Sequence, residues 1–117
     1  MLELNKMLNE VINDAISVGF PVSQSLERKI YIDKNRYDRV GACYRYSTYP
    51  ERYEIHLSEM TIKAKSNEIK NIIAHEVLHS CFLSMEHNNI WMMYKNLMNS
   101  KFGYDIQIYY SWHKILK

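Results

Sequence analysis

Residues 66–83 read SNEIKNIIAHEVLHSCFL, and this stretch decides the fold because a single helix accounts for its pattern. Ser66 is the expected N-cap, and Glu68 falls in the first turn, where a carboxylate interacts favourably with the helix dipole. The residues expected on the buried face recur at three- and four-residue steps: Ile69, Ile72, Ile73, Val77 and Leu83. We therefore predict a helix over about 67–83.

Within this helix, His75-Glu76-Val77-Leu78-His79 forms an HExxH box. Residues four apart share one face of a helix, so both imidazoles can hold one Zn²⁺ ion, with Glu76 beside them to activate a water molecule. That combination predicts a zinc hydrolase. The competing interpretation is a pair of helix histidines that bind no metal.

A catalytic zinc site usually has three protein ligands, so a third donor is expected. The donors that follow His79 are Cys81, Glu86, His87, Asp105 and His113. We favour His87, because the eight residues from His79 can span up to about 26 Å and so can return to the metal. Asn88 and Asn89, which tolerate left-handed backbone, would allow a turn there. Glu86 and Asp105 remain the alternatives.

The rest of the chain predicts further helices and a small sheet. Apolar periodicity indicates helices over about 2–18 and 91–102, the second ending at Gly103. Strands are expected at 29–32, 40–46 and 53–57, with 47–52 as a hairpin loop. Residues 106–117 fit either a strand or a helix. Together these elements predict an α+β fold.

The 117 residues suffice for one domain, spanning 1–117, and the net charge of +2 demands no anionic partner. Cys43 and Cys81 match no metal-binding spacing and are expected to be small buried residues. The first ten residues lack a signal-peptide core, and no apolar run is long enough to span a membrane. We therefore expect a soluble, cytoplasmic protein.

Five stretches together resemble the SprT-like family of zinc metalloproteases, particularly its short bacterial and phage members. They are 39–43 (RVGAC), 53–58 (YEIHLS), 70–79 (KNIIAHEVLH), 85–91 (MEHNNIW) and 99–106 (NSKFGYDI). The resemblance implies a zincin-like fold, in which a small antiparallel or mixed sheet packs on the HExxH helix between flanking helices. If the protein is phage-encoded, its expected location is the host cytoplasm.

The resemblance also implies His75, His79 and His87 as zinc ligands, Glu76 as general base, and hydrolysis of peptide bonds in a protein or peptide substrate. In the related Spartan proteases the targets are proteins attached to DNA. Two departures concern this chain: Asn88 stands where the family usually has Gly, and no cysteine follows Cys81 to form the C-terminal zinc-binding cluster of many members. A DNA-directing role of that cluster is therefore in doubt here.

Several further roles are weighed from the sequence. Tyr104 or His113 could stabilise the oxyanion, although Tyr104 fits a packing role equally well. The strand at 53–57 could present its edge to an extended peptide, with His56 either lining the cleft or exposed on the sheet. Residues 28–52 mix basic and tyrosine side chains, which could bind single-stranded DNA or form an ordinary exposed sheet surface.

The leading hypothesis is thus a zinc-dependent peptidase. The alternative from another class is a non-proteolytic, metal-containing, DNA-associated binding module, which would not need a base at Glu76. A third hypothesis is a zinc hydrolase that acts on a small amide.

Overall fold

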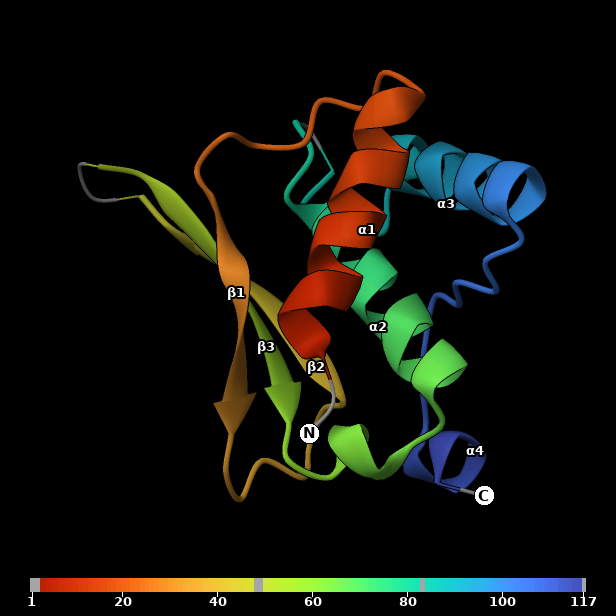
Figure 1. The fold of residues 1–117 in the computed structure, drawn as a ribbon. Helices are drawn as coiled ribbons and strands as arrows, with labels where there is room; N and C mark the ends of the chain where they lie inside the picture. The colour runs from red at the N-terminus through yellow and green to blue at the C-terminus, as the bar shows by residue number, and fades with distance from the viewer. Residues whose placement is uncertain (1–2, 48–49, 83, 117) are drawn as a thin grey trace.

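The computed structural model describes residues 3–47, 50–82 and 84–116, and in it the helices cover one face of a three-stranded sheet (Figure 1). The strands are β1 (Leu26–Asp33), β2 (Gly41–Tyr46) and β3 (Arg52–Ser58), in the spatial order β1-β3-β2. The central strand β3 runs parallel to β1 and antiparallel to β2. The predicted α+β class, with a small mixed sheet and helices, is confirmed.

Alternation along β3 separates the two faces of the sheet. Tyr53, Ile55 and Leu57 are buried in the hydrophobic core beneath the helices. Glu54 and His56 therefore point to the face away from the helices. This alternation decides which residues of the sheet can reach a site formed on the helices.

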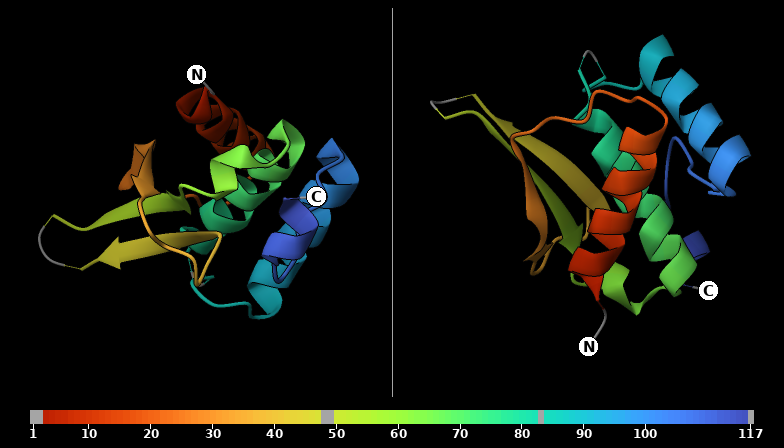
Figure 2. Two further views of the ribbon diagram at one scale, coloured as in Figure 1. Left: turned by 90° about the horizontal axis from the view of Figure 1, so that it is seen from below. Right: turned by 45° about the horizontal axis from the view of Figure 1, so that its top comes forward.

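The helices form two layers on the sheet, as the views in Figures 1 and 2 agree. In the first layer, α1 (Leu4–Ser17) contacts β1 and α2 (Ser66–His79) contacts β2. In the second layer, α3 (Asn89–Phe102) contacts α2 and α1. The remaining elements are a 3-10 turn, η1 (Thr61–Lys63), and a short helix, α4 (Trp112–Ile115). Helix α2 is consequently enclosed by protein on several sides.

Helix α2 differs from its prediction at both ends. The carbonyl of Lys65 already accepts a hydrogen bond from the Ile69 N–H, so Lys65 is the N-cap and Ser66 is the first helical residue. At the other end, the helix stops at His79 instead of continuing to 83, because Cys81 forms a β-bridge with Val22. Leu83, predicted for the buried face, lies outside the described residues.

Helix α3 begins and ends with capping interactions. The Asn88 side chain accepts a hydrogen bond from the Trp91 N–H at 2.9 Å, and Asn88 has an extended backbone rather than the predicted left-handed one. Gly103 ends the helix in the left-handed conformation, with φ of 77°, as the sequence predicts. The tail after Gly103 is mostly irregular and ends in α4.

Both cysteines are free, with Cys81 buried and Cys43 half-buried. Burial raises the pKa of both thiols, which agrees with the prediction that they are packing residues. Across the described ranges, none of the helices combines the length and the apolar character needed to cross a membrane.

Replacing Gly103 tests the cap of α3. A Cβ at this position would meet no atom within 4 Å, so Gly103→Ala should destabilise the fold only through its positive φ. We expect the free energy of unfolding to fall by about 1 kcal/mol, measured by urea denaturation. Gly103→Asn, which tolerates this conformation better, should lose less; equal losses in both variants would contradict the assignment.

Candidate metal centre

Helix α2 buries polar side chains at the centre of the molecule. His75, Glu76 and His79 are only 6%, 6% and 8% exposed, within a run of buried residues from Asn71 to His79. Burying imidazole and carboxylate groups costs free energy unless they find partners. A helix used only for packing would carry apolar residues at these positions.

Backbone carbonyls orient both imidazoles of α2. His75 Nδ1 lies 2.7 Å from the Gln107 carbonyl oxygen, and His79 Nδ1 lies 3.0 Å from that of Ser84. Since a carbonyl oxygen only accepts hydrogen bonds, each Nδ1 carries the proton and donates it. Each neutral ring therefore keeps a lone pair on Nε2, the nitrogen available to a metal.

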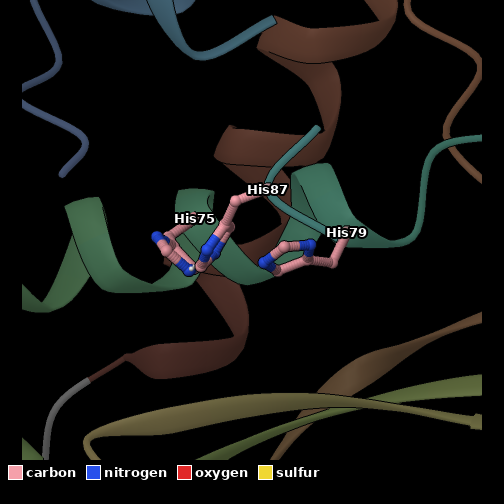
Figure 3. A group of neighbouring side chains, drawn as sticks. All are labelled: His75, His79 and His87. Atoms are coloured by element: carbon pink, nitrogen blue, oxygen red, sulfur yellow. Dashed lines mark hydrogen bonds between the residues drawn. The ribbon is translucent and has the colours of Figure 1, made fainter. Parts of the chain in front are cut away.

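His87 reaches the same point from the segment between α2 and α3, so that the three rings face one another (Figure 3). Its Nε2 lies 3.1 Å from the Nε2 of His75, and the ligand atoms of all three histidines lie within 4.8 Å of one another. Nitrogens about 2.0–2.1 Å from one tetrahedral ion would be separated by roughly 3.4 Å. The three histidines can therefore hold a metal ion.

The other candidate ligands do not join this cluster. Asp105 accepts a hydrogen bond from the Gln107 side chain at 2.7 Å, and the Cys81 thiol lies against the Val77 carbonyl inside α2. Glu86 is exposed beside His87, and His113 is in α4. In the described part of the chain, only His75, His79 and His87 form a group with ligand spacing.

Ser84 and the tail, which the sequence reasoning missed, support the histidines. The Ser84 hydroxyl donates to the carbonyls of Leu78 and Cys81, so the segment whose carbonyl holds His79 is fixed to the end of α2. In the tail, the Tyr110 hydroxyl accepts from the Gln107 N–H at 3.0 Å, which closes the turn that presents the Gln107 carbonyl to His75. Backbone carbonyls leave no residue-type signal in a sequence.

Trp91 packs against all three imidazoles. Its ring centroid lies 4.8 Å from that of His75, 5.3 Å from His79 and 4.6 Å from His87, and its Nε1 donates to the His75 carbonyl at 3.4 Å. The sequence identified Trp91 as a core residue of the third helix, but not as this support. Tyr109, which is 81% exposed, also lies beside the site, with its ring 5.8 Å from His87.

Glu76 lies at the edge of the cluster, with its Oε2 4.0 Å from His75 Nε2. Burial raises the pKa of Glu76 to about 8, an effect that the positive charge of Arg39 partly offsets. Burial lowers the pKa of His75 to about 3 and that of His79 to about 4. At neutral pH both imidazoles are thus neutral, as metal ligands must be, and Glu76 binds a proton readily.

The structure does not support three of the possible roles that the sequence raised, and it agrees with the packing role considered for Tyr104. The Tyr104 hydroxyl donates to Asp14 of α1 at 2.7 Å, so this tyrosine stabilises helix packing, and neither Tyr104 nor His113 contacts the histidine cluster in the described structure. His56 lies on the far face of the sheet, 2.8 Å from Asp33 and 3.0 Å from Glu54, and does not line the site. The strand predicted at 53–57 is the central β3, so β2 provides the edge nearest α2.

The basic and tyrosine-rich segment 28–52 forms the hairpin and the far face of the sheet. Several of its arginines pair with carboxylates: Arg36 and Arg39 with Asp38, Arg45 with Glu51, and Arg52 with Glu54. Tyr31 and Tyr44 pack on His56, while Tyr49 lies outside the described residues. Single-stranded DNA binding by this segment stays a prediction.

The pKa shifts predict how the stability of the metal-free protein depends on pH. The folded pKa of Glu76 lies above that of an unfolded Glu, so stability falls as pH rises from about 6.5 towards 8, by up to about 1.4 kcal/mol per unit. The folded pKa values of His75 and His79 are depressed, so stability also falls as pH drops from about 6.5 towards 5. Maximum stability is therefore expected near pH 6.5.

Urea denaturation with chelator present, between pH 5 and 8, measures this profile. In Glu76→Gln the decline above pH 6.5 should disappear, so that the variant is more stable than the wild type at pH 8. The decline at acid pH should remain, because it comes from the imidazoles. A wild type whose stability is constant between pH 6.5 and 8 would contradict the assignment to Glu76.

Comparison with known proteins gives one match, to a protein family. No curated protein and no solved structure matched the chain. The sequence model of one protein family matches residues 3–110, which is nearly the whole chain. The matched range includes the three histidines, Glu76 and the supporting Gln107. On this match, the chain belongs to the SprT-like family.

Proposed function

We propose that this chain is a zinc-dependent peptidase of zincin-like fold, with His75, His79 and His87 as ligands and Glu76 as general base. The observation that carries the proposal is the convergence of three imidazoles with one buried carboxylate beside them. Membership of the SprT-like family, which is associated with metalloproteases, supports the same assignment. A binding module without catalysis would not need a carboxylate whose burial is costly.

Zinc is the metal that best suits this donor set. Three neutral imidazole nitrogens without a carboxylate or thiolate ligand match known catalytic zinc sites, which leave a fourth position for water or substrate. When bound, zinc supplies Lewis-acid chemistry by polarising a carbonyl and making a water molecule acidic near neutral pH. The Nδ1 hydrogen bonds of His75 and His79 to backbone carbonyls would hold the rings in position.

Glu76 moves the proton in this proposal. Its raised pKa makes the carboxylate a better base near neutral pH than an exposed glutamate, and the buried position excludes bulk water as a competing acceptor. Glu76 takes a proton from the attacking water and returns it to the amine that leaves when the peptide bond breaks. Arg39 keeps part of the Glu76 population ionised at neutral pH, because its positive charge opposes the effect of burial.

The outer edge of β2 favours a peptide over a small amide as the substrate. Ser58 N donates to Val40 O, and hydrogen-bonded pairs alternate along an antiparallel ladder, so the N–H and C=O groups of Gly41, Cys43 and Arg45 point away from β3. An extended peptide could add there as a further strand. β2 contacts α2, which carries Glu76, so this edge lies on the side of the sheet nearest the candidate metal centre.

Cytoplasmic location stays a prediction from the sequence, and substrates that are bound to DNA stay a prediction that depends on the family resemblance. The ion pairs along 28–52 provide no additional argument for a nucleic-acid partner.

Replacing Glu76 tests its role directly. Glu76→Gln should keep zinc at the stoichiometry of the wild type but cleave a peptide library about 10²–10⁴-fold more slowly, because the variant cannot accept the proton. Metal analysis and mass spectrometry of the products measure the two properties. Cleavage by the purified variant at the wild-type rate would remove Glu76 from the role of base.

Replacing His87 tests the ligand set. Loss of a residue that only hydrogen-bonds a metal ligand typically lowers metal affinity about 10–100-fold. His87→Ala removes a proposed ligand itself, so it should lower zinc affinity by more than that. Competition with a chromophoric chelator measures the affinity. His113→Ala, in which a histidine outside the cluster is removed, is the matched control and should bind zinc as the wild type does. Unchanged affinity in His87→Ala would assign the third ligand to another residue.

A further inference from the structure

A pocket of about 540 Å³ opens between the end of the β2–β3 hairpin and the segment that follows α2. Arg45, Glu51 and Tyr53 line it from the hairpin, while Phe82, Met85 and Glu86 line it from the segment. This segment connects two residues of the candidate metal centre, His79 and His87 (Figure 3). The pocket is therefore next to the place where a peptide would be cut.

The wall formed by the segment is apolar and exposed, although its backbone is fixed. Phe82 is 69% exposed and Met85 is 38% exposed, so both side chains present apolar surface to the pocket. The Phe82 N–H donates to the Pro21 carbonyl, and the neighbouring Cys81 pairs with Val22. Because the backbone at Phe82 is already held, this side chain can contact a ligand with little loss of backbone conformational entropy.

The charges around the pocket disfavour an acidic ligand. Both the Nε and the Nη2 of Arg45 donate to Glu51 Oε2, at 3.1 and 2.7 Å, so the cation is already matched by a carboxylate. Glu86 adds a second carboxylate to the lining. The three charged side chains thus sum to one negative charge, which would repel Asp or Glu in a substrate.

The position of the pocket along β2 relates it to the scissile bond. Gly41 faces α2, since a Cβ there would lie 3.2 Å from Ile72, and by alternation Cys43 and Arg45 share that face. Cys43 lies on this face between Gly41, which meets Ile72 of α2, and Arg45, which lines the pocket about 7 Å further along the strand. Burial raises the pKa of the Cys43 thiol, and the negative charge of Glu76 contributes to the same increase. If a peptide pairs with β2, one of its side chains enters the pocket. That side chain belongs to a residue within about two positions of the peptide bond that lies near Glu76.

We propose that this pocket is a specificity subsite that binds one large apolar side chain of an extended peptide substrate, such as Phe, Leu or Met, within two residues of the cleaved bond. The inference rests on the proposed peptidase function. The size fits, because a cavity of about 150 Å³ already holds a benzene ring. Tyr53 and Met85 supply aromatic and thioether surface, which suits an aromatic side chain.

Binding and cleavage test the subsite separately. Zinc-loaded Glu76→Gln would be titrated with a series of fluorescent peptides of one length, in which Phe, Leu, Ala or Asp replaces each position in turn. At one position we expect Phe and Leu to bind about tenfold more tightly than Ala, with Asp the weakest. Cleavage by the wild type should follow the same order in kcat/KM.

Variants then assign the preference to the pocket. Phe82→Ser and Met85→Ser, both at exposed positions, should reduce the preference for Phe over Ala at least threefold while zinc stoichiometry stays unchanged. Ile32→Ser is the matched control: Ile32 is an exposed apolar residue on β1, at the opposite edge of the sheet, and the preference should stay intact.

The two proposals fail differently. Zinc-dependent cleavage with no preference among the peptides, or with a preference that both variants keep, overturns the subsite and leaves the peptidase intact. Preferential binding that the variants abolish, in a protein that cuts no peptide, supports the pocket and overturns the peptidase.

Discussion

The enclosure of α2 between the sheet and α3 is the constraint on which the rest of the structure depends. A helix in this position normally carries apolar residues on all sides. Here its C-terminal half presents His75, Glu76 and His79 to the interior, and the surrounding segments supply hydrogen-bond acceptors for the two imidazoles. Ser84 holds the segment after the helix, and Gln107 in the tail reaches back across it. The connections of this small domain are thus arranged around three polar side chains.

The sequence predicted the elements whose signal is local. Periodicity identified α1, α2 and α3, alternation identified the β2–β3 hairpin, and Gly103 marked the end of α3. The placement of the candidate ligands His75 and His79 on one face of a helix follows from their spacing alone. The chain length after His79 allows His87 to return to the two helix histidines, and in the structure its ligand atom lies within 4.8 Å of theirs.

What the sequence could not predict depends on long-range pairing. The parallel pairing of β1 with β3 makes β3 central, so β1 and β2 are the edge strands, and neither fact leaves a trace in the individual strands. The position of Tyr104, one residue after the end of α3, is compatible with either a packing or a catalytic role. Only its hydrogen bond to Asp14, which the sequence does not reveal, favours packing. The early end of α2 results from the Val22–Cys81 bridge, which joins segments about 60 residues apart.

The adjacency of His87 and Asn88 has a mechanical consequence. Asn88 caps α3, and His87 belongs to the cluster on α2, so a cation held there would cross-link the two helices across a short closed loop. Both cysteines are free, which leaves the cation in the role that a disulfide plays in many small domains. Depletion of the ion would then loosen the seating of α3 against α2.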